Sequence, residues 1–119
     1  MKYEHLKRID LQCIAEEACD FLGIHQRHWP RVILKKKGME GDMGECIYND
    51  QDKPPIIHLY NSYLKANNVS QVSTLLHEVG HVAITYGLKL DMEAKMEETI
   101  VVEWERMLYM LYMLGMFRQ

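Results

Sequence analysis

The sequence predicts one α+β domain over residues 1–119, built from an N-terminal helix, a small three-stranded sheet and a C-terminal helical hairpin. Composition indicates a globular protein, because 48% of the 119 residues are hydrophobic and 26% are charged. A chain of this length can bury one modest core but not two. Apolar residues recur at helical spacing towards both ends, whereas short segments separated by glycine and proline occupy the middle.

The first expected helix spans residues 3–22, and Gly23 follows it as a stop signal. Its apolar residues form two neighbouring stripes, which are Leu6, Ile9 and Cys13, and Leu11, Ile14, Ala15, Ala18 and Leu22. Three strands are expected next, at residues 31–37, 45–49 and 56–60, with the turn-forming segments 38–44 and 50–55 between them. The order is therefore a helix with a wide apolar face, followed by a small sheet.

Two further helices are expected to form the hairpin. The first spans residues 69–86, because Asn68 and Gln71 have the spacing of a capping box and Gly87 ends the pattern. Its apolar stripe consists of Val72, Leu75, Leu76, Val79, Ala83 and Tyr86. Asp91 can cap the second helix, whose stripe consists of Met96, Ile100, Trp104, Met107, Leu111 and Leu114. The short link between these helices makes them antiparallel neighbours.

Charge and cysteine content exclude several classes of partner. The net charge is −3, and the only basic run is Lys35-Lys36-Lys37, so no nucleic-acid partner is expected. The longest uncharged stretch, residues 107–117, is shorter than the ~20 residues that span a bilayer. Cys13, Cys19 and Cys46 lack the spacing of a thiolate metal site, so buried or partly buried thiols are expected. Without a signal pattern at the N-terminus, the chain is expected to be cytoplasmic, with no membrane partner.

The sequence His77-Glu78-Val79-Gly80-His81 has the spacing of a metal site. Two histidines four residues apart on a helix are separated by about 40° around its axis, so both imidazoles can reach one ion. Zinc in a hydrolase takes three protein ligands and leaves one position for water. Glu78 can lie beside that water and act as the general base of the reaction. If Val79 marks the middle of the apolar stripe, both histidines point away from the core.

A third ligand is expected from the last helix. The hairpin brings positions 96–98 level with the two histidines, and Glu97 lies about 60° from the centre of the apolar stripe at Ile100. Glu98 lies about 160° away, and Glu93 comes about a turn too early. Glu97 is therefore preferred, and Glu98 and Glu93 remain alternatives. Solvated histidines and an ordinary surface glutamate are the competing interpretation of the same residues.

The HEVGH sequence, preceded by Ser73-Thr74-Leu75-Leu76, resembles the active-site helix of the zincin metallopeptidases. A glutamate on the next helix resembles the gluzincin subgroup of that family. A strand at residues 55–61 that leads into the motif helix is similar to the ImmA/IrrE-like minimal gluzincins and to small metallopeptidases of phages or mobile elements. The resemblance implies a zincin-like fold and peptide-bond hydrolysis with one zinc ion.

By this resemblance His77 and His81 are zinc ligands, Glu97 is the third ligand and Glu78 is the catalytic base. The substrate is expected to be a protein or peptide, with a transcriptional repressor as one such protein. The strand at residues 56–60 is a candidate to pair with the substrate backbone, and a plain core strand is the alternative. The alternative function is a zinc-binding regulatory or interaction module that does not cleave peptides. The oligomeric state is left open.

Overall fold

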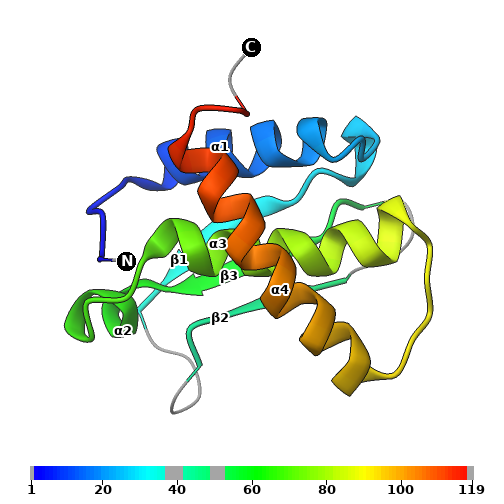
Figure 1. Cartoon of the computed structure of the whole chain (residues 1–119). Coiled ribbons are helices and arrows are strands. Elements are labelled where there is room, and N and C mark those ends of the chain that lie inside the picture. The colour runs from blue at the N-terminus through cyan, green and yellow to red at the C-terminus, as the bar shows by residue number, and fades with distance from the viewer. Residues whose placement is uncertain (1, 37–41, 49–52, 118–119) are drawn as a thin grey trace.

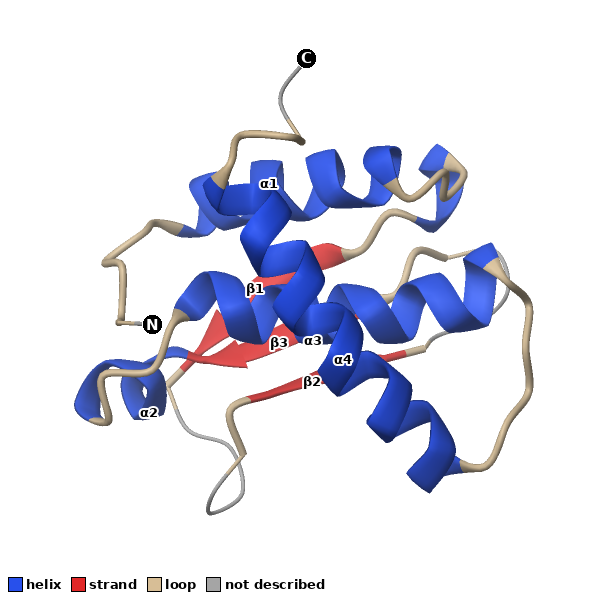
Figure 2. Ribbon diagram, in the orientation of Figure 1, coloured by secondary structure: helices blue, strands red, loops and turns tan. Residues whose placement is uncertain are grey.

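The structure is a computed structural model that describes residues 2–36, 42–48 and 53–117. Within these residues the chain is α+β, with a three-stranded mixed sheet and the long helices gathered on one side of it (Figures 1 and 2). The strands are β1 (Arg31–Lys35), β2 (Gly44–Ile47) and β3 (Ile56–Tyr60), and the helices are α1 (Arg8–Phe21), α2 (Asn61–Ala66), α3 (Gln71–Val82) and α4 (Ala94–Met113). The predicted α+β class is confirmed.

The sheet has the order β1-β3-β2, so β3 is its central strand. β1 runs parallel to β3 with Val32 opposite Ile57, and β2 runs antiparallel to β3 with Glu45 opposite His58. Because β3 is paired along both edges, a substrate has no free edge there, and the predicted backbone pairing with residues 56–60 is wrong. The alternative interpretation of β3 as a core strand is confirmed by the complete burial of Ile57 and Leu59.

The N-terminal helix is shorter than predicted, because α1 begins only at Arg8. The Asp10 carboxylate accepts a hydrogen bond from the Lys7 backbone N–H at 3.2 Å, which marks the start of the helix. Only the second of the two predicted stripes lies in the core, where Leu11, Ile14, Ala15 and Ala18 are buried. In the first stripe, Ile9 is 56% exposed and the Cys13 thiol is exposed, so the expectation of a buried Cys13 is wrong.

A different residue from the predicted one caps α3. Ser70 is the N-cap and its hydroxyl oxygen accepts a hydrogen bond from the Ser73 N–H at 3.0 Å. The Glu4 carboxylate, from the N-terminal segment, accepts from the Gln71 N–H at 2.6 Å and from the Ser70 hydroxyl. The Gln71 side chain instead bonds the backbone of Leu6. The predicted capping box of Asn68 and Gln71 is therefore wrong, although the helix lies where the periodicity placed it.

The hairpin forms as predicted, with different local details. α3 continues into a π-helical turn at Ala83–Gly87, and α4 then runs back and crosses α3 obliquely (Figure 1). Glu93, and not Asp91, is the N-cap of α4. The predicted stripe on α4 is only partly right. Trp104 and Leu111 pack against the core, but Met96, Met107 and Leu114 are more than half exposed, and the buried residues of the helix are Val101 and Leu108. The short helix α2 was not predicted, because only Leu64 of its six residues lies in the core.

Across the described residues, no helix is long and apolar enough to cross a membrane.

Candidate metal centre

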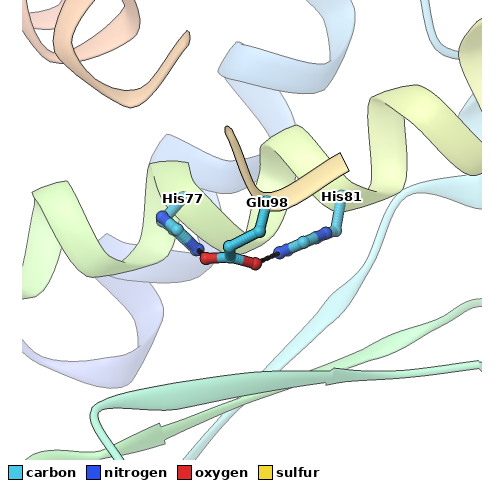
Figure 3. A group of neighbouring side chains, drawn as sticks. All are labelled: His77, His81 and Glu98. Carbon is cyan, nitrogen blue, oxygen red and sulfur yellow. Dashed lines mark ion pairs between the residues drawn. The ribbon is translucent and has the colours of Figure 1, made fainter. Parts of the chain in front are cut away.

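Two histidines on α3 and a glutamate on α4 bring their ligand atoms together, and Figure 3 shows the three side chains pointing toward one another. His77 Nε2 lies 2.6 Å from Glu98 Oε1, and His81 Nε2 lies 3.1 Å from Glu98 Oε2. The ligand atoms of this group all lie within 4.8 Å of one another. Two imidazole nitrogens and a carboxylate oxygen at this separation could hold a metal ion.

The close approach of α3 and α4 places Glu98 level with both histidines. A Cβ atom at Gly80 would lie only 3.1 Å from Val101 Cγ1, so the glycine between the two histidines lets the helices come close. Glu98 precedes Val101 by three residues and therefore lies on the same face of α4, one turn nearer its start. The preferred prediction of Glu97 in this position is therefore wrong, and the alternative, Glu98, lies there.

The outer nitrogen of each histidine is held by a further carboxylate from α4. His77 Nδ1 donates a hydrogen bond to Glu105 Oε1 at 2.8 Å, and the Ser73 hydroxyl donates to the second oxygen of Glu105 at 2.9 Å. His81 Nδ1 donates to Glu97 Oε2 at 2.5 Å. Such carboxylate contacts fix the orientation and the tautomer of metal-binding imidazoles. Glu97 thus orients His81 from the side opposite to Glu98.

The chemistry of this donor set fits a divalent cation. An ionised carboxylate only accepts hydrogen bonds, so the Nδ1 atoms that face Glu97 and Glu105 carry protons. In a neutral imidazole the Nε2 atom is then an unprotonated acceptor, and in both histidines it faces the Glu98 carboxylate. When His77 is protonated, its Nε2 N–H donates to Glu98, so a cation held by these three groups would take the place of that proton.

The same contacts change the pKa values of the groups involved. The hydrogen bond to Glu105 raises the pKa of His77 to about 8, against the opposing effect of burial. Burial by itself would raise the pKa of Glu105, but hydrogen bonds from His77 and Ser73 hold it below its ordinary value. Glu105 is therefore ionised at neutral pH and able to hold the His77 ring.

Glu78 is buried beside the histidines without a hydrogen-bonding partner among the described residues. Its side chain is only 6% exposed, and burial raises its pKa to about 7. No fully buried side-chain polar atom in the described part of the chain lacks a partner, so the Glu78 oxygens retain contact with solvent. A carboxyl group that is buried, unpaired and still reachable by water is suited to proton transfer.

Two cavities meet at this group. The larger one, of about 510 Å³, lies towards the start of α3, and a second one, of about 310 Å³, lies along β2. Both are lined by Gly44, His77, Glu78 and Glu98. A Cβ atom at Gly44 would lie 3.0 Å from the His58 carbonyl oxygen and 3.2 Å from the Thr74 methyl group. The missing side chain therefore lets β2 lie close to α3 beside the cavities.

Tyr86 at the end of the motif helix and His58 on β3 lie away from this group. Tyr86 stacks on His28 with 4.3 Å between ring centroids, and it lines neither cavity. His58 Nδ1 lies 3.2 Å from Glu45 Oε1, and the Tyr60 hydroxyl donates to the same oxygen at 2.5 Å. This cluster joins β2 to β3 and serves to fix the position of the edge strand.

Glu98 was expected only as an alternative third ligand, and no role was expected for Glu105. Together with Val101 and Leu108 they recur at intervals of three and four residues, which is the seam of a helix packed against one partner. This seam could have been read from the sequence. The many methionines and leucines on the neighbouring face obscured it.

Comparisons of the chain with protein-family models, with curated proteins and with solved structures found no match.

Proposed function

We propose that this chain is a zinc metallopeptidase that hydrolyses peptide bonds in a protein or peptide substrate. The observation that carries the proposal is Glu78, which is buried, unpaired and next to both histidines at the meeting point of two cavities. A purely structural carboxyl group would be expected to have a hydrogen-bonding partner. The resemblance of the HEVGH sequence to the zincin motif supports the same function.

His77, His81 and Glu98 would hold the zinc ion, with Glu98 in the role first assigned to Glu97. Two histidines and one glutamate form a known ligand set of catalytic zinc and leave a position for water. Zinc in such a site polarises the scissile carbonyl group and lowers the pKa of water. Glu97 and Glu105 would hold the two imidazole rings with Nε2 directed at the ion.

Glu78 would act as the general base. With a pKa near neutrality it can accept a proton from the attacking water and then deliver that proton to the departing amine. Its position one residue after His77 points the carboxylate into the space between α3 and β2. The buried surroundings keep the group fixed relative to the reacting atoms.

The substrate would extend along the outer edge of β2. In the order β1-β3-β2 this strand is an edge next to the metal centre, and it takes no second strand partner among the described residues. An extended peptide can add to such an edge through backbone hydrogen bonds. Gly44 lies on β2 beside Glu78, so backbone rather than a side chain would face the scissile bond.

The test compares the wild-type chain with Glu78→Gln, using Glu103→Gln as a matched control. Glu103 is exposed and contacts neither histidine. We expect cleavage of an unfolded protein or a peptide mixture by the wild type and by Glu103→Gln. Loss of the base should reduce the rate about 10²–10⁴-fold, while the zinc content stays the same. Cleavage that persists in Glu78→Gln would refute the proposed mechanism. Zinc binding without cleavage in the wild type would favour the non-proteolytic zinc module.

A further inference from the structure

The larger cavity combines apolar side chains with carboxylates. Met43 and Val69 contribute apolar surface to its lining, and Asp42 and Glu105 contribute carboxylates. At about 510 Å³ it has room for a long side chain next to His77. A lining of this kind suits a ligand that is apolar along its length and charged at its end.

Among the described residues that line the two cavities, every charged side chain other than histidine is acidic. These residues are Asp42, Glu45, Glu78, Glu98 and Glu105. A bound divalent cation would offset the charges of Glu78 and Glu98, which are next to it. The charges of Asp42 and Glu105 remain in the larger cavity. The cleft is therefore electronegative even when the metal centre is filled, and it favours a cationic ligand.

The helix end near this cavity, which would otherwise attract anions, is already neutralised. The N-terminus of α3 reaches the cavity at Ser70, and free backbone N–H groups at such a helix end bind anions. Here the Glu4 carboxylate accepts from the Gln71 N–H and from the Ser70 hydroxyl. An internal carboxylate thus takes the position that an acidic ligand would need.

A second observation indicates that a ligand enters this cavity. Glu78 projects into it, is 6% exposed and lacks a hydrogen-bonding partner among the described residues. The two Glu105 oxygens differ in this respect, because His77 and Ser73 occupy them. Asp42 is exposed at the cavity rim and is the carboxylate open to a charged group from outside.

We infer that the larger cavity accepts a lysine or arginine side chain next to the cleaved bond, so that the substrate class is a basic peptide segment. The aliphatic stem packs on Met43 and Val69, and the cationic end lies near Asp42. This inference rests on the proposed peptidase function. It adds to that function the chemical class of the residue that the cleft selects.

The first test exposes the zinc-loaded chain to a random peptide library and identifies the cleaved bonds by mass spectrometry. We expect lysine and arginine to be enriched at one position flanking the cleaved bond, by about tenfold over glutamate. Asp42→Lys should abolish this enrichment. Asp20→Lys, which makes the same change of net charge at the exposed end of α1, should leave it unchanged. Cleavage with no charge preference, or with a preference for acidic residues, overturns the inference and leaves the peptidase function standing.

The second test measures binding alone and so does not depend on turnover. The zinc-loaded Glu78→Gln chain is titrated with fluorescent peptides that differ only in one lysine, leucine or glutamate, and anisotropy reports binding. We expect the lysine peptide to bind about tenfold more tightly than the glutamate peptide, and added salt should shrink the difference. Equal binding of the three peptides, or no binding of any, overturns the inference. Preferential binding of the lysine peptide without any cleavage by the wild type would contradict the peptidase function alone.

Discussion

The two helices that form the metal centre are held in different ways. Ten of the twelve residues of α3 are buried, whereas only Val101 and Leu108 are fully buried among the twenty residues of α4. α3 lies between the sheet, α1 and α4 (Figure 2), so its histidines are fixed by the core. α4 contacts α3 along one narrow seam. Three of the residues on or beside that seam are glutamates that contact the histidines: Glu97, Glu98 and Glu105.

The two helices therefore contribute to the site in different ways. α3 supplies the rigid half, with two imidazoles and the Glu78 carboxyl group in a packed environment. α4 supplies the half whose position depends on a few apolar contacts and on the histidine–carboxylate contacts. A metal ion shared by both helices would therefore stabilise the docking of α4 more than the fold of α3.

The largest expected contrast is one of stability. Replacing the fully buried Leu76 of α3 by alanine should lower the free energy of unfolding by about 2–5 kcal/mol. Replacing Met113 of α4, which is 65% exposed, should change it by less than about 0.5 kcal/mol. Urea unfolding in the presence of a chelator measures both values. Similar losses of unfolding free energy for the two variants would contradict this contrast. They would show that Met113 is buried in solution, although it is exposed in the single chain.

A substitution at the crossing point of the helices should affect both halves. Gly80→Leu places a side chain against Val101 and should destabilise the chain by about 1–3 kcal/mol. It should also weaken zinc binding, because α4 carries Glu98. Adding Val101→Ala makes room and should recover part of both losses. The close Gly80–Val101 contact would be disproved if Gly80→Leu bound zinc as tightly as the wild type.

The orienting carboxylates should have a smaller effect, confined to the metal. Glu105→Gln and Glu97→Gln should each weaken zinc binding about 10–100-fold, because each removes the charged acceptor of one imidazole. Competition with a chromophoric chelator measures the affinities. Glu103→Gln lies on the exposed side of the same helix and should have no effect. If Glu103→Gln weakened zinc binding by the same factor, the effect of Glu97 and Glu105 would be one of overall negative charge and not of holding the imidazoles.

Removing the metal should give the smallest and most local change. Amide hydrogens of residues 94–100 should exchange faster after chelation, whereas those of residues 71–76 should not change. The reason is that the start of α4 has no buried apolar residue before Val101. Hydrogen exchange followed by mass spectrometry measures both segments in one experiment. Faster exchange in α3 would show that the metal stabilises the core as well.

The same contrast explains which features the sequence could predict. On α3 the apolar stripe is the core, and Val72, Leu75, Leu76 and Val79 are all fully buried, so the motif helix was located well. On α4 the exposed Met107 and Leu114 look like core residues, and they shifted the predicted face away from Val101 and Leu108. A shift of one residue is a rotation of about 100° on a helix, which is enough to exchange Glu97 for Glu98.

Other differences arise from contacts between distant parts of the chain. Glu4 caps α3 from sixty-seven residues away in sequence, and a local sequence pattern cannot predict a cap at that separation. The position of β3 in the middle of the sheet follows from its parallel pairing with β1, which strand patterns do not specify. The histidine pair and Glu78 needed only local spacing, and they lie together as the motif required.

The metal centre is tested most directly by zinc binding to three chains: the wild type, Glu98→Ala and Glu97→Ala. We expect one zinc ion per wild-type chain. Glu98→Ala removes a ligand and should weaken binding well beyond the about 10–100-fold loss expected for Glu97→Ala, which removes only the acceptor of His81. A wild-type chain that binds no zinc, or an equal loss of affinity in the two variants, would contradict a site formed by His77, His81 and Glu98.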